Sequence, residues 1–156
     1  MIKKLPLLIF AVALIHFLPL SSEAGLRGLP EGAPAVGLGS SAPLNTEELK
    51  KANKEGKVIL LMFGNPDHCV YCERVWRSVS DLQEQYEKDA AGVLTKHRAS
   101  KFWGPVSESV ALGETYGVIG EPWLFLIDKK GIIRRIFRGF VEKGEIEKGL
   151  KEVLRQ

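Results

Sequence analysis

Two cysteines, Cys69 and Cys72, are the residues of this chain best suited to covalent chemistry. A thiolate attacks disulfides, and two thiols three positions apart can close into a disulfide of their own. The residues before the pair predict a buried strand and those after it a helix. Unpaired backbone N–H groups and the positive end of the helix dipole at such a junction favour a thiolate at Cys69. Cys72 follows one helical turn later, close enough to release a bound partner.

Three other roles for the cysteine pair are weighed against disulfide exchange. A purely structural disulfide remains an alternative, although so short a loop constrains the unfolded chain little. A metal site also remains an alternative, with His68 and His97 as the further ligands, although their spacing is not that of a zinc finger. Covalent haem attachment needs a histidine directly after the second cysteine, and Glu73 at that position excludes it.

The elements that must position the cysteines follow from the hydrophobic pattern. The order is that of an α/β domain with a central mixed sheet and helices on both of its faces. We expect a short helix that Asn45 caps and that ends near residue 55. The further elements that we expect are a buried strand at 57–63, a helix at 70–88, a weak strand at 93–99, a helix at 106–116, strands at 123–127 and 132–137 around a turn at 128–131, and a helix at 142–154.

Composition places these elements in a single domain. A chain of 156 residues with 45% hydrophobic and 26% charged residues has the balance of one globular domain. The formal net charge of +3 includes no block of Lys and Arg, so we expect no nucleic-acid partner. Residues 25–44 are rich in Gly and Pro and predict a flexible leader, and residues 45–156 form the domain.

The N-terminal residues 1–24 predict a signal peptide. Lys3 and Lys4 precede an apolar run at residues 5–20, and the small residues Ser22 and Ala24 predict cleavage after Ala24. The run is shorter than the roughly 20 residues that span a bilayer, although a retained membrane anchor stays an alternative. We therefore expect a periplasmic or secreted protein. An oxidising compartment would let the two cysteines pair.

A second signal lies well downstream, where Pro122 precedes an apolar strand in the segment Gly120-Glu121-Pro122-Trp123. Proline cannot donate to a sheet, so at the start of a strand it usually marks a turn or an edge. By itself the segment predicts no more than that. Together with the cysteines it forms a wider pattern, which comprises a strand, Cys69-x-x-Cys72 at the start of a helix, Tyr116-Gly117-Val118-x-Gly120-x-Pro122 before a strand, the turn Asp128-Lys129-Lys130-Gly131, a further strand and Gly139.

This pattern, over residues 45–156, resembles the thioredoxin superfamily, and most closely small periplasmic thioredoxin-like proteins, including those linked to sulfur oxidation and cytochrome maturation. The resemblance implies a thioredoxin-like fold, with Cys69 as nucleophile, Cys72 as resolving thiol and a Cys69–Cys72 disulfide in the oxidised state. It also implies that Pro122 is a cis-proline facing the disulfide. In that family the proline loop, here with Glu121, pairs with the backbone of the substrate and keeps metal from the thiols.

Several positions depart from thioredoxin itself. Val70 and Tyr71 stand between the cysteines in place of Gly-Pro, and a Tyr there is more like the periplasmic disulfide isomerases. Met62 occupies the place of a buried strand acid, which removes the usual proton relay. His68 precedes Cys69 in place of Trp. His68 and Tyr71 are therefore candidates for tuning the pKa of the thiols.

Two of the departures act in opposite directions on the redox chemistry. A protonated His68 near Cys69 would stabilise the thiolate and make the pair more oxidising. The charge of Glu121 near the same sulfur would raise the pKa of the thiol and make the protein more reducing. We expect a reductant, because Glu121 lies in the loop that should touch the active site.

The expected function is thus an exported thiol–disulfide oxidoreductase without a cofactor. Its partners would be protein thiols and disulfides and a separate electron donor or acceptor, such as a membrane redox protein. The alternative is a thioredoxin-fold chaperone module that holds a metal ion or a partner without redox turnover. Disulfide isomerases of this compartment usually dimerise through an extra domain, which this sequence lacks, so we expect a monomer.

Overall fold

A fully buried strand at the centre of a four-stranded sheet organises the fold. The computed structural model describes residues 36–96 and 108–156, and of residues 108–110 only the backbone. Strand β1 (Val58–Phe63) is buried at every position. It pairs in parallel with β2 (Ala90–Thr95) and antiparallel with β3 (Trp123–Ile127), and β4 (Ile133–Arg138) pairs antiparallel with β3. The sheet order is therefore β2-β1-β3-β4.

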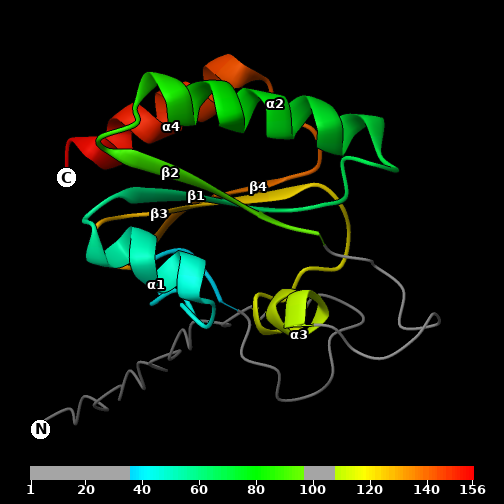
Figure 1. Cartoon of the computed structure of the whole chain (residues 1–156), viewed down its shortest axis with the longest axis horizontal. Coiled ribbons are helices and arrows are strands. Elements are labelled where there is room, and N and C mark those ends of the chain that lie inside the picture. Colours follow the sequence, from blue (N-terminus) through cyan, green and yellow to red (C-terminus); the bar gives the residue numbers. More distant parts are fainter. Residues whose placement is uncertain (1–35, 97–107) are drawn as a thin grey trace, which may run out of the picture.

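Helices cover both faces of this mixed sheet, as the sequence predicts (Figure 1). Helices α2 (Val70–Gln85) and α4 (Lys143–Leu154) lie together on one face. Helices α1 (Glu47–Lys54) and α3 (Glu108–Thr115) lie on the other. With both faces covered, the central strands need apolar side chains on both sides, which explains the continuous apolar run of β1.

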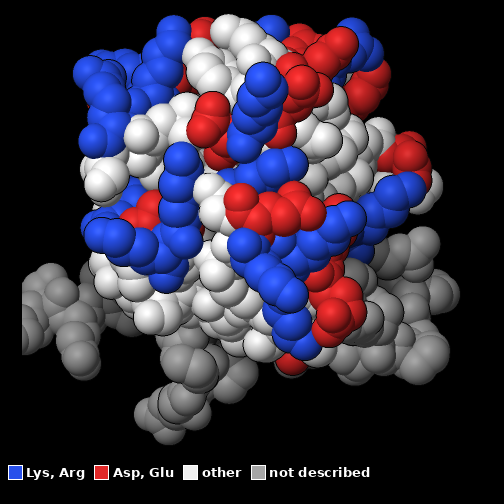
Figure 2. Space-filling model, turned by 60° about the vertical axis from the view of Figure 1, so that its left-hand side comes forward, with Lys and Arg blue, Asp and Glu red and all other residues white. Residues whose placement is uncertain are grey.

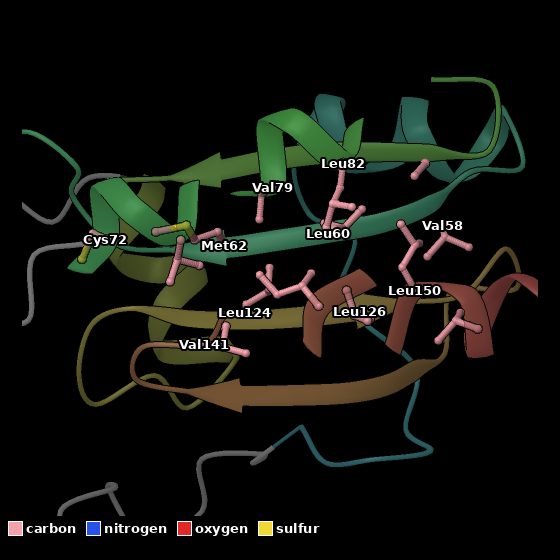
Figure 3. Packing of buried hydrophobic residues seen from close by; sticks show 14 residues of the cluster. Val58, Leu60, Met62, Cys72, Val79, Leu82, Leu124, Leu126, Val141 and Leu150 are labelled. Atoms are coloured by element: carbon pink, nitrogen blue, oxygen red, sulfur yellow. The ribbon is translucent and has the colours of Figure 1, made fainter. Parts of the chain in front are cut away.

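The alternation of side chains along β1 divides the interior into two clusters. Val58, Leu60 and Met62 pack with α2 and α4 in the cluster that Figure 3 shows. The intervening residues, Ile59, Leu61 and Phe63, pack in a second cluster against α1 and α3. Cys72 belongs to the first cluster and lies at one end of it, so the apolar interior extends to the chemistry-bearing motif (Figure 3).

Some element ends differ from their predicted positions. Thr46, rather than Asn45, caps α1, and its Oγ1 accepts a hydrogen bond from the Leu49 N–H at 3.3 Å. Helix α2 ends at Gln85. In the turn that follows, the Tyr86 carbonyl accepts hydrogen bonds from the N–H groups of Asp89 and Ala90. Strand β2 begins at Ala90, because Ala90 is the partner of Val58 at the start of β1. The pairing partner, rather than local hydrophobicity, sets the start of this strand.

The described part of the predicted flexible leader, residues 36–44, lies against the hairpin of β3 and β4. The Gly39 N–H donates to the Ile133 carbonyl at 2.8 Å, and the Ala42 N–H donates to the Gly131 carbonyl at 2.8 Å. Val36, Ala42 and Leu44 pack against the second cluster. Backbone hydrogen bonds to the hairpin and a few apolar contacts therefore hold residues 36–44 against the domain. The rest of the leader and the predicted signal peptide, residues 1–35, lie outside the described residues.

The surface carries both signs of charge. On the face that Figure 2 shows, Lys and Arg side chains alternate with Asp and Glu. Several of them form exposed ion pairs, such as Lys143 with Asp81 at 3.0 Å across α4 and α2. No helix within residues 36–96 and 108–156 has the length and apolar character needed to span a bilayer.

Asp128 fixes the turn between β3 and β4. The buried carboxylate accepts hydrogen bonds from the N–H groups of Lys130 and Ile132, and from Nε of Arg134 at 2.7 Å. Burial alone would raise the pKa of Asp128, but the bonds from Ile132, Arg134 and Lys130 outweigh it and lower the pKa below its usual value. The turn thus depends on an ionised carboxylate.

We expect the substitution Asp128→Asn to lower the free energy of unfolding at pH 7 by about 2 kcal/mol, since it removes a buried acceptor that bonds a charged donor. Because the pKa of Asp128 is depressed in the folded state, its contribution is complete above about pH 4 and is lost as the pH falls through the folded value. Urea denaturation at pH 7 and pH 3 measures the difference. Asp89→Asn, which removes an exposed pair with Lys129, is the control and should change little. Equal effects of the two substitutions would contradict the role of Asp128.

Candidate active site

The antiparallel pairing of β1 with β3 brings the two sequence signals together. Phe63 at the end of β1 is the partner of Trp123 at the start of β3. The residues beyond these two ends, the loop before Cys69 and the loop around Pro122, are therefore neighbours. A hydrogen bond joins them directly, since the Asn65 N–H donates to Oε2 of Glu121 at 3.0 Å.

Asn65 closes the loop that leads into α2. Its carbonyl accepts hydrogen bonds from the N–H groups of His68 and Cys69, both at 3.1 Å. Its side-chain Oδ1 accepts a bond from the Asp67 N–H at 3.1 Å. A short polar side chain that bonds the backbone two residues later is typical of a tight turn. The turn places Cys69 at the N-cap position, directly before the first residue of α2.

Cys69 is the N-cap of α2, with extended backbone angles of φ −131° and ψ 108°. Its Sγ accepts a hydrogen bond from the Cys72 N–H at 3.1 Å. A backbone donor in the first turn of a helix, together with the helix dipole, stabilises negative charge on an acceptor at this position. The side chain is half-buried, so solvent and a substrate can reach it. The predicted strand–helix junction is therefore present.

Cys72 is fully buried behind Cys69, and the structure contains both cysteines as free thiols. A glycine, Gly64, makes the close approach to this thiol feasible, because a Cβ at that position would stand 3.1 Å from Cys72 Sγ and 3.0 Å from Cε of Met62. Burial raises the pKa of the Cys72 thiol to about 12, and the neighbouring Cys69 sulfur and the Glu121 carboxylate add to the increase, while the Asn65 N–H opposes it. The two thiols of the motif thus occupy different environments.

Glu121 is the charged group that contacts a thiol. The Cys72 thiol donates a hydrogen bond to its Oε2 at 3.6 Å. The peptide bond between Glu121 and Pro122 is cis, as the resemblance implied. The Pro122 carbonyl accepts a hydrogen bond from the Gly139 N–H at 2.8 Å, which ties the loop to the end of β4. Glu121 therefore meets Cys72, whereas the sequence analysis considered its effect on Cys69.

The other two tuning candidates are exposed. The His68 side chain is exposed, and its charge acts on Asp67, whose pKa is lowered first by the hydrogen bond from Lys96 and then by the charges of Lys96 and His68. The ring of Tyr71 is exposed and lies 5.8 Å from the ring of Phe140 between centroids. Its described ring partner is thus on the loop after β4.

Sequence reasoning missed Asn65 and Phe140. The signal for Asn65 was its place in a Gly-Asn-Pro turn directly before the cysteines. Phe140 follows Gly139, whose φ of +85° favours glycine, so an aromatic residue stands at an exposed bend. The Arg74 guanidinium lies 4.4 Å from the centroid of the Phe140 ring. Phe140 enters the site through contacts with a distant segment, whereas Asn65 also bonds residues beside it in the same loop.

No group of three or more potential metal ligands gathers within the described part of the chain. Of the two histidines considered as ligands, His97 lies outside that part. Hydrogen bonds do connect Cys69, Cys72 and Glu121. The Glu121 carboxylate accepts bonds from the Cys72 thiol and from the Asn65 N–H. This arrangement is suited to holding a proton.

Comparison with known proteins places the chain in a family. The model of the thioredoxin-like domain matches residues 46–154. The thiol-disulfide oxidoreductase ResA of Geobacillus thermodenitrificans strain NG80-2 is 28% identical over 139 aligned positions, which cover 76% of this chain and 79% of that protein.

Solved structures show the same fold. A Chlorobium tepidum protein assigned as the thiol:disulfide interchange protein DsbE aligns with a TM-score of 0.62 at 23% identity, over 77% of this chain and 99% of its own. A thiol-disulfide isomerase of Corynebacterium glutamicum aligns with a TM-score of 0.54 at 18% identity, over 81% of this chain and 99% of its own. The exposed lipoprotein thioredoxin Etrx1 of Streptococcus pneumoniae TIGR4 aligns with a TM-score of 0.50 at 25% identity, over 65% and 88% respectively.

The different environments of the two thiols predict different reactivity. In the reduced protein at pH 7.5, we expect iodoacetamide to modify Cys69 and to spare Cys72, because Cys72 is buried and its pKa is raised. Peptide mapping by mass spectrometry measures the modification of each residue. The same reaction in denaturant should modify both cysteines. Equal modification of both in the native protein would contradict the described geometry.

Proposed function

The chain belongs to the thioredoxin-like family, and on this basis we propose that it is an exported thiol–disulfide oxidoreductase that reduces protein disulfides. The observation that carries the proposal is the arrangement of its two thiols. Cys69 caps a helix and accepts the Cys72 N–H at 3.1 Å, and Cys72 is buried behind it. An accessible nucleophile with a second thiol one turn away is what disulfide exchange requires. The name of the Geobacillus relative, a thiol-disulfide oxidoreductase, supports the same reaction class.

The reaction consists of two exchange steps. The Cys69 thiolate attacks one sulfur of a substrate disulfide, forms a mixed disulfide and releases the first substrate thiolate, which takes a proton from water. Cys72 then attacks Cys69 Sγ, forms the Cys69–Cys72 disulfide and releases the second substrate thiol. The substrate gains two electrons and two protons, and the protein dithiol loses both. A separate dithiol donor returns the protein to its reduced form.

The surroundings of Cys72 support the reductant direction. Burial, then the Cys69 sulfur and the Glu121 carboxylate at 3.6 Å, raise the pKa of Cys72 to about 12 and so disfavour its thiolate. Near pH 7 the dithiol form therefore gains no stabilisation from a Cys72 thiolate, which is the kind of stabilisation that makes a dithiol strongly oxidising. A protonated His68 would instead stabilise the Cys69 thiolate and favour the oxidant direction. This effect has less support, because the His68 side chain is exposed and water screens its charge.

The substrate would bind across the cis-proline loop and the apolar residues around the motif. We assign Pro122 and Glu121 to substrate contact, since their loop is joined to the cysteine loop by the bond between Asn65 and Glu121. Large apolar side chains are exposed on both sides of this junction. They are Val70 at 63%, Tyr71 at 54%, Ile119 at 50% and Phe140 at 37% exposure. Exposed apolar groups beside a nucleophilic thiol suit an unfolded or extended protein segment.

Export is supported by the predicted signal peptide and by a structural neighbour. Residues 1–24 carry a basic start, an apolar run and a small-residue end. The name of the pneumococcal neighbour describes an exposed lipoprotein. We place the protein in the periplasm or outside the cell, as a monomer. Its electron donor would be a separate redox protein, such as one in the membrane.

In a turbidity assay with insulin and dithiothreitol, we expect the mature protein to accelerate reduction of the insulin disulfides. Cys69→Ser should abolish the acceleration, because it removes the nucleophile. Cys72→Ser should also stop turnover, and it should accumulate a stoichiometric mixed disulfide visible on a non-reducing gel. Glu73→Gln, which alters an exposed charge next to Cys72, is the control and should retain activity. Equal acceleration by Cys69→Ser and by the unaltered protein would overturn the proposed function.

The reductant direction predicts a low reduction potential. Equilibration with glutathione or dithiothreitol should give a value closer to the roughly −270 mV of thioredoxin than to the roughly −120 mV of a strong oxidant. Removing the negative charge with Glu121→Gln should make the potential less negative, because a carboxylate beside the motif disfavours negative charge on the reduced dithiol. Glu73→Gln should leave it unchanged. A value near −120 mV in the unaltered protein would contradict the direction.

A further inference from the structure

Resolution of the mixed disulfide requires Cys72 to lose its proton, and the surroundings of Cys72 disfavour this ionisation. To resolve the mixed disulfide it must become a thiolate, yet it is fully buried and its thiol holds its proton up to a pKa of about 12. A buried nucleophile of this kind needs a proton acceptor within reach.

The neighbours of Cys72 leave one acceptor among the described residues. The titratable groups that act on its thiol are Cys69, one turn earlier, and Glu121, from the loop before β3. Cys69 is bonded to the substrate at this stage and its sulfur cannot take the proton. Met62 of β1 lies in the same cluster as Cys72, and it is apolar and fully buried. The other members of the cluster around Cys72 are apolar as well.

The Glu121 carboxylate is placed to receive this proton. Its Oε2 already accepts the hydrogen bond of the Cys72 thiol at 3.6 Å. The same oxygen accepts the Asn65 N–H at 3.0 Å, which holds the carboxylate against the loop before the cysteines. Glu121 is half-buried, so a proton on its carboxyl can leave to solvent without passing through the apolar cluster.

We propose that Glu121 is the catalytic proton acceptor for Cys72 in the step that resolves the mixed disulfide. The inference rests on the proposed function and assigns a role within it. The Cys72 thiol gives its proton to Oε2 of Glu121, and Cys72 Sγ attacks Cys69 Sγ. The Cys69–Cys72 bond forms, the bond from Cys69 to the substrate sulfur breaks, and the substrate leaves as a thiolate. That thiolate takes a proton from the Glu121 carboxyl or from water, which restores the carboxylate or leaves it to re-ionise in solvent.

The charge balance of the pair explains how one group can both oppose and assist ionisation. While Glu121 is ionised, its negative charge disfavours a second negative charge on Cys72. When Glu121 takes the proton it becomes neutral, and the charge that opposed the thiolate disappears. The two groups therefore share one proton and behave as a coupled pair. The Asn65 N–H remains in place as a donor to the site throughout.

A two-phase reaction with 5,5′-dithiobis(2-nitrobenzoate) separates the two steps. Attack of Cys69 releases one equivalent of the coloured thiolate, and attack of Cys72 on the resulting mixed disulfide releases the second. Stopped-flow absorbance on the reduced protein records both phases. In Cys72→Ser only the first phase should remain, which identifies the second phase as resolution.

We expect Glu121→Gln to slow the second phase by about a hundredfold near pH 7, the lower end of the range for general acid–base catalysis, and to leave the first phase within about twofold. The deficit should shrink as the pH rises, because hydroxide can then take the proton of Cys72. Glu121→Asp, which keeps a carboxylate, should recover part of the rate. The control Glu73→Gln should leave both phases and their pH profiles unchanged.

The outcomes separate the inference from the proposed function. A second phase that is equally fast in Glu121→Gln and the unaltered protein would overturn the role of Glu121, while the insulin assay would still stand. A deficit that is the same at every pH, or that Glu121→Asp does not relieve, would also overturn it, because a purely structural effect predicts that result. Loss of both phases in the unaltered protein would instead remove the proposed function.

Discussion

The pairing of β1 with β3 is the constraint on which the site depends. Because the two strands run antiparallel and Phe63 lies opposite Trp123, the end of one strand and the start of the other occupy the same edge of the sheet. The cysteine loop follows the first and the proline loop precedes the second. Residues 56 positions apart, Asn65 and Glu121, thereby come within hydrogen-bond distance. A shift of one residue in this register would turn the strand's side chains to the opposite faces and separate the two loops.

The two thiols differ in burial, and this difference gives them different reactivity. Cys69 stands at the helix N-terminus, half-buried, with a backbone donor on its sulfur, which suits the attack on a substrate. Cys72 belongs to the apolar cluster below α2, where burial raises the pKa of its thiol. Gly64 permits this close packing, because any side chain there would meet the Cys72 sulfur. The same apolar interior that stabilises the fold thus sets the reactivity of the resolving thiol.

Much of the fold was predictable from local pattern, and the exceptions have a common cause. The buried strand Val58–Phe63 was predicted within one residue, and the start of the helix after Cys69 was predicted at Val70, because their patterns are continuous. The start of β2, by contrast, depends on its partner Val58. Residues 36–44 were expected to be free, yet the hairpin of β3 and β4 holds them. In both cases the deciding hydrogen bonds come from segments distant in the sequence.

The sequence by itself determined the chemistry of this protein. The spacing of Cys69 and Cys72 at a strand–helix junction, with Pro122 before a strand, specified a thioredoxin-like domain with a dithiol motif. It left open which of His68 and Glu121 lies nearer to Cys69, and it considered no contact between Glu121 and Cys72. Only the tertiary structure decided this, because the bond from Cys72 to Glu121 spans 49 positions and is set by strand register. Local sequence pattern identifies the residue types of the site. Contacts between side chains that are distant in the sequence depend on the strand register of the assembled sheet.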